Sequence, residues 1–307
     1  MSNKIIKLSI SLTILSIIFW YIGFNNIVAK IGNMNISAFL FINVITLFGF
    51  LSGGAGVILL GKNINPNLSW KDGMKGFLSA SSLALFFPGR VGDATLLFFW
   101  KSYLEYGSCM AIVMIDKLVT LLVVIIFGSL GLGVTFNLAV GVIAFLSLFL
   151  PGLISLILIG LPITRTFIAQ KMPKRIKPFF EGLVTTIKYL AKQGHRTLLT
   201  LLILTVFRVM AYGIGFWVSI WGVGLTVPFF YSIFVICIAQ LSGLIPITVM
   251  GLGSVEGVCI YAFAQIGIQE ASAITAALLI GRGINILWLA VFFLVFSVAR
   301  IPHQKIH

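Results

Sequence analysis

Two short segments of this chain place a carboxylate beside glycine and proline inside otherwise apolar sequence. The first covers residues 87–93 and ends at Asp93, and the second covers residues 245–257 and contains Glu256. An acidic side chain inside a membrane domain costs roughly 2.5–3.5 kcal/mol to insert, so each is a candidate functional residue. Helix-breaking segments at corresponding places in two halves of a membrane chain are typical of a transporter-like binding site.

Taken together, the two segments combine free backbone amides with charges of both signs. Amides at helix starts attract anions, and arginine binds phosphate through two parallel hydrogen bonds. Glycine also permits close backbone approach. A zwitterionic or phosphate-bearing headgroup would suit such a site. We predict that the tips of the two segments are formed by Pro88, Gly89, Gly92, Pro246, Gly251 and Gly253.

Charged side chains in or near the apolar sequence are the predicted contacts for that headgroup. The alternative for each of them is an ion pair across the bundle with a folding role. We predict that Arg282 faces Glu256 or a headgroup phosphate. We also predict that Asp93 meets Glu256 near the middle of the membrane. The full set is Arg90, Asp93, Lys101, Asp116, Lys117, Arg208, Glu256 and Arg282.

The composition identifies the environment of these residues. Of the 307 residues, 60% are hydrophobic and only 9% are charged, whereas soluble domains carry about 25% charged residues. Long apolar runs without strict alternation favour helices over an outer-membrane barrel. The chain is therefore predicted to be an all-α polytopic membrane protein. The net charge of +14 is explained by basic loops that stay in the cytoplasm, and no nucleic acid is expected as a partner.

Six full spans are predicted from the apolar runs, and the charges between them set their orientation. The segment 161–196 carries eight cations and one acid, so we place it in the cytoplasm together with both termini. This orientation corresponds to a multi-pass protein of the cell (inner) membrane. The predicted spans cover residues 5–24, 36–60, 109–130, 135–160, 197–222 and 274–299.

Two further regions, 73–105 and 228–270, cannot be pairs of full spans. Their return legs, 94–100 and 258–269, reach at most about 18 Å at the helical rise, against a core of about 30 Å. We predict re-entrant hairpins that enter from the cytoplasm in the first half and from outside in the second. The 307 residues then form a single membrane domain, in which the halves 1–160 and 197–307 are related as an inverted repeat.

The connector 161–196 alternates apolar and basic residues with helical spacing. Its pattern is typical of an amphipathic helix lying on the membrane face. One interpretation is an orientation signal with a surface helix, and the other is docking of anionic lipid headgroups.

Enzyme and metal signatures are missing from the sequence. It contains no paired carboxylates for a metal–diphosphate site, no P-loop, no HExxH and no GxSxG. The three cysteines lie singly in apolar segments, and the histidines lie in a loop and the tail. No metal, no cofactor and no enzymatic activity are therefore predicted.

The motifs resemble the transmembrane domain of the lysylphosphatidylglycerol synthase/flippase family. That family has the pattern P-x-R-x-G-E, then E-R, then L-P-I-x-x-G-G-L-G-x-x-E-G, then a membrane arginine. Asp93 and Asp116 stand where the family usually has glutamate, and Thr120 replaces a common aspartate. The resemblance does not include the soluble aminoacyl-transfer domain, so it does not imply aminoacylation. The matching residues are Pro88–Asp93, Asp116–Leu118, Leu244–Pro246, Gly251–Gly257 and Leu279–Arg282.

This resemblance implies a flippase-like protein that moves a lipid between leaflets, either an aminoacylated phospholipid or a polyprenyl-linked glycolipid. Two alternatives remain open. One is a membrane-embedded transferase acting on a lipid-linked sugar, with Asp93 or Glu256 as base. The other is a non-catalytic partner of envelope-glycan synthesis. The predicted partners are membrane lipids, with a second copy of the chain and envelope-lipid biosynthesis enzymes as further candidates.

Overall fold

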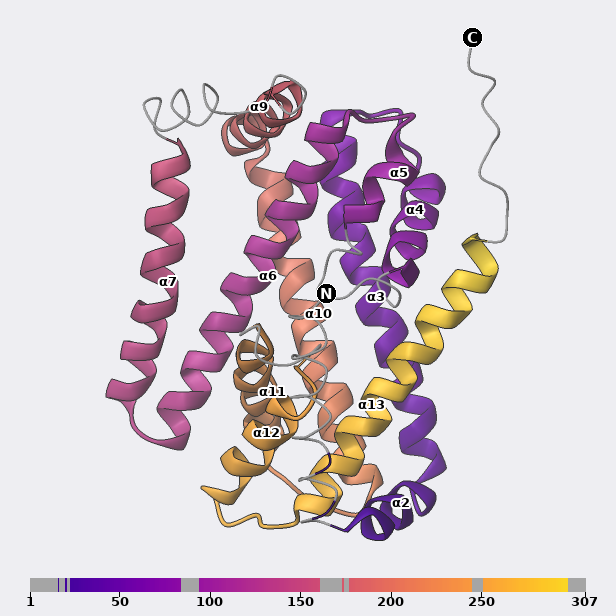
Figure 1. Ribbon diagram of the computed structural model, residues 1–307, viewed down its shortest axis with the longest axis vertical. Coiled ribbons are helices and arrows are strands. Elements are labelled where there is room, and N and C mark those ends of the chain that lie inside the picture. The colour runs from indigo at the N-terminus through magenta and orange to yellow at the C-terminus, as the bar shows by residue number, and fades with distance from the viewer. Residues whose placement is uncertain are drawn as a thin grey trace. The chain divides into compact units, whose positions relative to one another are not determined.

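The computed structural model describes residues 16, 20, 23–83, 94–160, 173, 177–244 and 251–297. Within these ranges the chain forms eleven α-helices and one short π-helix, and no strand. Figure 1 shows these helices in chain order. The all-α fold predicted from the composition is confirmed.

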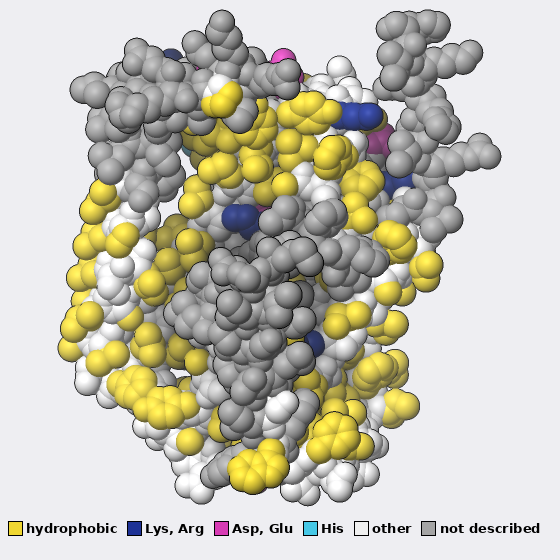
Figure 2. Space-filling model, in the orientation of Figure 1, with side chains coloured by type: hydrophobic (Ala, Val, Ile, Leu, Met, Phe, Trp, Pro, Cys, Tyr) yellow, Lys and Arg dark blue, Asp and Glu magenta, His cyan; other side chains and the backbone are white. Residues whose placement is uncertain are grey.

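Four helices are long and apolar enough to cross a membrane: α3 (Ile36–Ile64), α6 (Tyr106–Thr135), α10 (His195–Gly222) and α13 (Ala271–Phe292). The last of these continues as the π-helix η3 (Phe293–Ser297). At about 1.5 Å per residue each exceeds the roughly 30 Å hydrocarbon core. Hydrophobic side chains cover much of the visible surface of the described residues, as expected for contact with lipid (Figure 2). Four of the six predicted spans are thus found as helices of the required length.

The other two predicted spans are described in part. Helix α7 (Leu138–Gly160) is apolar throughout and coincides with the predicted span 135–160. The predicted span 5–24 lies almost entirely outside the described residues. The short helix α2 (Phe24–Gly32) begins where that span was predicted to end, after Gly23 in a left-handed conformation with φ of 85°.

Two pairs of short helices occupy the regions predicted to be hairpins. The first pair is α4 (Trp70–Leu83) and α5 (Leu96–Trp100), and the second is α11 (Phe229–Leu244) and α12 (Ser254–Ala264). Within each pair the helices lie side by side (Figure 1). The return helices α5 and α12 are only about 7.5 and 16 Å long at the helical rise, so neither leg is a full span. The side from which each hairpin enters the membrane stays a prediction.

The helices group into two compact units whose boundary falls inside α3, α6, α10 and α13. Unit 1 comprises residues 1–49, 120–165 and 206–284 and contains α11 and α12. Unit 2 comprises residues 50–119, 166–205 and 285–307 and contains α4 and α5. Each unit therefore holds one hairpin, and each draws on both halves of the sequence. The inverted repeat of the halves 1–160 and 197–307 stays a prediction.

In unit 1, aromatic residues fix α12 against its neighbours. The Phe263 ring on α12 lies 6.2 Å from the Phe216 ring on α10 and 5.7 Å from the Tyr231 ring on α11. The Tyr231 hydroxyl donates to the Ala262 carbonyl at 2.7 Å. Since Phe263 is completely buried, these contacts set the position of the whole of α12, including its N-terminus.

In unit 2, Trp100 fills a notch lined by glycine. Its ring is 1% exposed, and a β-carbon on Gly76 of α4 would lie 2.5 Å from its Nε1 atom. A β-carbon on Gly61 of α3 would lie 2.9 Å from the same ring. Small residues at these two positions therefore allow α4 and α5 to pack closely against α3.

Helix α9 (Lys177–Gln193) is the described part of the basic connector. Its apolar residues Leu183, Val184 and Leu190 are buried, and its backbone lies so close to Gly107 of α6 that a β-carbon there would meet the Phe179 carbonyl at 2.6 Å. The hydroxyls of Ser108 and Thr186 are 3.0 Å apart. The prediction of an amphipathic helix is confirmed, but its apolar face is covered by protein of unit 2 and not by lipid.

Candidate functional site

The turn before α12 has the geometry that only glycine adopts readily. Gly251 and Gly253 have φ of 71° and 85°, in the left-handed region where a β-carbon is strained. Gly253 is the N-cap of α12, and its N–H donates to Glu256 Oε2 at 2.8 Å. Because the first amides of a helix have no partner inside it, a carboxylate at this position stabilises the helix start. Both predicted glycines therefore serve the turn that holds Glu256.

Arg282 of α13 completes this centre. Its Nη2 atom lies 3.1 Å from Glu256 Oε1, and it also donates to the Gly251 carbonyl at 3.4 Å. The 3.1 Å contact is an ion pair without a well-aligned hydrogen bond to Oε1. Of the two partners that the sequence allowed for Arg282, Glu256 is confirmed as one in this structure.

The two members of the pair differ in exposure. The Glu256 side chain is 0% exposed, whereas that of Arg282 is 26% exposed. A buried carboxylate without a cation costs several kcal/mol, so Glu256 requires Arg282. Arg282, in contrast, has five N–H donors in a planar fork, and its side chain is partly exposed. The centre can therefore receive an external anion at Arg282 without first exposing Glu256.

Unit 1 holds a second predicted cation, Arg208 of α10. Its Nη2 atom donates to the hydroxyl of Thr120 on α6. Thr120 stands at the position where the family that the sequence resembles commonly has aspartate. In the structure, Arg208 therefore reaches the position of that aspartate, where a neutral threonine hydroxyl is among its hydrogen-bond acceptors.

In unit 2, Asp116 and Lys117 of α6 face the first hairpin. Lys117 Nζ lies 3.5 Å from Asp116 Oδ2, and the aspartate side chain is 3% exposed against 37% for the lysine. With Ser81 of α4 and Leu96 of α5 they line a cavity of about 20 Å³, which is room for about one water molecule. Lys101 lies exposed in the turn after α5 and does not line this cavity.

The remaining predicted site residues, Pro88, Gly89, Arg90, Gly92, Asp93 and Pro246, lie outside the described residues. The predicted meeting of Asp93 with Glu256 therefore stays a prediction.

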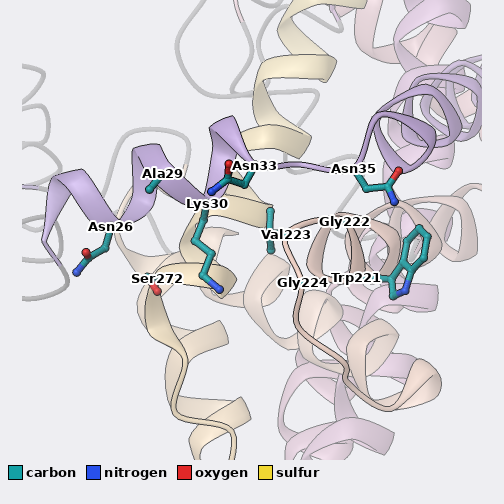
Figure 3. A pocket seen from close by; sticks show the side chains of 10 residues that line it. All are labelled: Asn26, Ala29, Lys30, Asn33, Asn35, Trp221, Gly222, Val223, Gly224 and Ser272. Atoms are coloured by element: carbon teal, nitrogen blue, oxygen red, sulfur yellow. The ribbon is translucent and has the colours of Figure 1, made fainter.

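Unit 1 also holds a polar pocket that the sequence motifs did not predict. Its volume is about 740 Å³, and Figure 3 shows Lys30 of α2 projecting into its middle, toward Ser272 and Val223. The sequence signal for it is the cluster of asparagines around Lys30 in a chain that is otherwise apolar. Its lining residues are Asn26, Ala29, Lys30, Asn33, Asn35, Trp221, Gly222, Val223, Gly224 and Ser272.

A family model matches almost the whole chain. Residues 4–296 match the family described as the lysylphosphatidylglycerol synthase TM region. No curated protein matches the sequence. The match includes both hairpins, the Glu256–Arg282 centre and the Asp116–Lys117 pair, and it supports a multi-pass membrane protein. This chain therefore belongs to the family of lysylphosphatidylglycerol synthase transmembrane regions.

Proposed function

We propose that this protein binds a lipid with a phosphate-bearing headgroup inside the membrane and moves it between leaflets. The lipid classes that we propose are an aminoacylated phospholipid and a polyprenyl-linked glycolipid. Membership of the family supports a role that involves membrane lipids. The Glu256–Arg282 centre is the observation that carries the proposal.

The centre has the chemistry that a phosphate headgroup requires. Arginine binds phosphate through its planar fork, with shorter and stronger hydrogen bonds than a neutral donor makes. Glu256 holds the guanidinium from one side, and the partly exposed Arg282 side chain can meet the ligand from the other. A cationic headgroup, such as one with an amino-acid ester, could in turn approach the carboxylate once Arg282 has engaged the phosphate.

The charges of the first hairpin would form the other end of the path. We propose that Arg90 and Asp93 act there as Arg282 and Glu256 act in the second hairpin, supported by Asp116 and Lys117. Re-entrant hairpins that approach from opposite faces would then enclose one cavity near the middle of the membrane. In this arrangement Lys101 and Arg208 contact the headgroup on its way in or out, and both termini lie in the cytoplasm of the cell that carries the protein.

The proposal is tested by lipid translocation in vesicles. Purified protein is reconstituted with an aminoacylated phosphatidylglycerol that carries a fluorescent acyl chain, and the outer leaflet is quenched with a membrane-impermeant reductant. Arg282→Gln should slow translocation by at least about tenfold, since a hydrogen bond to a charged group contributes about 1.5–3 kcal/mol. Lys188→Gln removes an exposed charge from α9 and should translocate like the wild type.

Equal folded yield of the variants, measured by gel filtration, separates loss of function from loss of fold. Wild-type translocation by a well-folded Arg282→Gln variant would contradict the proposal. Formation of a new product when the protein is given a labelled lipid-linked sugar donor would favour the transferase instead. Full activity of Glu256→Gln in cells, with no translocation by any variant, would favour the non-catalytic partner.

A further inference from the structure

Unit 1 holds an apolar groove close along the chain to its polar pocket. The groove has a volume of about 480 Å³, and its residues come from the end of α6, the start of α11 and the loop after α12. None of the described lining residues is common to the two, but two segments run past both. The segment 221–230 lines the pocket with residues 221–224 and the groove with Pro228 and Phe230, and the segment 266–272 lines the pocket with Ser272 and the groove with Ile266 and Ile268. The groove is lined by Val134, Pro228, Phe230, Tyr231, Phe234, Ile266 and Ile268.

The two parts lie within a short distance of each other. Gly224 of the pocket and Pro228 of the groove are four residues apart, so at most about 14 Å of chain separates them. The same limit applies to Ser272 of the pocket and Ile268 of the groove. A polar hollow and an apolar channel at this spacing match an amphiphile with a compact head and one chain.

The polar part favours an anionic head. Lys30 is the only cation among the described residues that line it, and none of those residues is acidic. Glu270 lies 4.0 Å from Lys30 Nζ, and the two side chains are 56% and 37% exposed. Exposed pairs of this kind contribute little, so Lys30 remains able to bind an anion. The asparagine amides around it can donate to and accept from hydroxyl groups.

The described side chains of the apolar groove present carbon atoms to a ligand. The Tyr231 hydroxyl donates to the Ala262 carbonyl at 2.7 Å and lies 3.0 Å from the Thr135 hydroxyl. Its polar tip is therefore already bonded, and its ring is left to line the groove. Phe230 is 65% exposed, which in a membrane protein is a surface for an acyl chain.

We propose that unit 1 carries a second lipid site, separate from the Glu256–Arg282 centre. It binds a membrane lipid with an anionic, hydroxyl-bearing headgroup in the pocket around Lys30 and one acyl chain in the groove around Phe230. The proposal goes beyond the proposed function, because it requires only that the protein lies in a membrane. By the charge pattern of the sequence, this site faces the outside.

Photo-cross-linking in vesicles tests the proposal. Phe230 is replaced by a photoreactive phenylalanine analogue in protein reconstituted into phosphatidylcholine with a minority of phosphatidylglycerol. The matched control carries the same analogue at Leu146, an exposed position on α7. Mass spectrometry of the adducts should show phosphatidylglycerol enriched at position 230 relative to position 146.

Lys30→Gln should reduce that enrichment about fivefold, the effect of one cation on an anionic headgroup. Asn33→Leu is the second variant and should also reduce it. Glycerol 3-phosphate added to the outside should compete poorly, since it lacks the chain. Equal lipid composition at positions 230 and 146, no effect of either variant, or competition by glycerol 3-phosphate at the affinity of the lipid would each overturn the proposal.

The same experiment distinguishes this site from the first one. Arg282→Gln should leave the enrichment at position 230 unchanged. If Arg282→Gln abolishes translocation while Lys30→Gln changes no cross-link, the second site is wrong and the proposed function stands. If Lys30→Gln lowers the enrichment while the Arg282→Gln variant translocates lipid normally, the second site stands and the proposed function is wrong.

Discussion

The two hairpins are stabilised by different means. In the second hairpin, α12 begins with a carboxylate that caps its own first turn and pairs with an arginine from α13. In the first hairpin, the five-residue helix α5 is held by Trp100 in a notch lined by glycine. One hairpin therefore depends on a buried charge pair, and the other on close packing.

The difference shows which hairpin is suited to respond to an anion. Packing around Trp100 provides no counter-charge for an anion, because dispersion contacts act between neutral groups. The Glu256–Arg282 pair, in contrast, contains a cation, Arg282, whose side chain is partly exposed. Near the first hairpin, the predicted headgroup contacts Asp116 and Lys117 lie on α6, whereas the charges of α4 itself, Lys71, Asp72 and Lys75, lie in its first two turns. The predictions below test this contrast.

The largest effect should come from breaking the charge pair of the second hairpin. Glu256→Gln leaves Arg282 without its carboxylate, and Arg282→Gln leaves a buried carboxylate without its cation, a loss of up to about 3–5 kcal/mol. The double variant should lose less than the sum of the two, since it leaves neither charge alone. Thermal unfolding in detergent measures all three. Strict additivity would show that the two side chains do not interact.

A smaller effect is expected from filling the notch of the first hairpin. Gly76→Ala places a methyl group 2.5 Å from Trp100 Nε1 and should destabilise the protein by about 1–3 kcal/mol. Gly182→Ala on α9 is the matched control, because its new methyl group would lie 3.5 Å from its nearest neighbour. A melting temperature of Gly76→Ala equal to that of the control would mean that Trp100 is not tightly packed.

The turn of the second hairpin should be sensitive to backbone conformation. Gly253→Ala forces a β-carbon into a residue with φ of 85° and should cost about 1–2 kcal/mol. Gly257→Ala, four residues later in the same helix, has nothing within 4 Å of its new methyl group and should stabilise by about 0.5–1 kcal/mol. Opposite shifts in melting temperature are expected, and shifts of the same sign would contradict the left-handed turn.

The smallest effect concerns pH at the start of the first hairpin. Hydrogen bonds from Ser69 and Tyr103 hold the pKa of Asp72 below its ordinary value of 3.8. Because the pKa of Asp72 is lower in the folded than in the unfolded state, its ionised form stabilises the protein at a pH above the unfolded-state pKa. This stabilisation is lost as the pH falls through the folded-state pKa. Tyr103→Phe removes one of these bonds and should raise the pKa of Asp72. Melting curves between pH 6 and 3 should therefore fall less for this variant, and a steeper fall would contradict the assignment.

Several features of the fold follow from local sequence. Uninterrupted apolar runs predicted α3, α6, α10 and α13, since a helix is what satisfies backbone polar groups in lipid over that length. Short apolar runs broken by glycine and proline likewise predicted the two hairpin regions. Glu256 and Arg282 were identifiable because charges are rare in such sequence. The pattern of α9 predicted its helix but not what covers its apolar face, because lipid and protein interiors are equally apolar.

The sequence by itself therefore determined the membrane class, the long helices, the two pairs of short helices and which charges stand in apolar sequence. Only the tertiary structure decided that Arg282 pairs with Glu256 and caps the Gly251 turn, that α9 packs on Gly107, and that Lys30 faces a pocket with Ser272. Each of these depends on how helices distant in sequence approach each other. Apolar periodicity specifies which residues avoid water, but the choice of partner depends on where glycine permits close approach and where a buried charge finds its counter-charge.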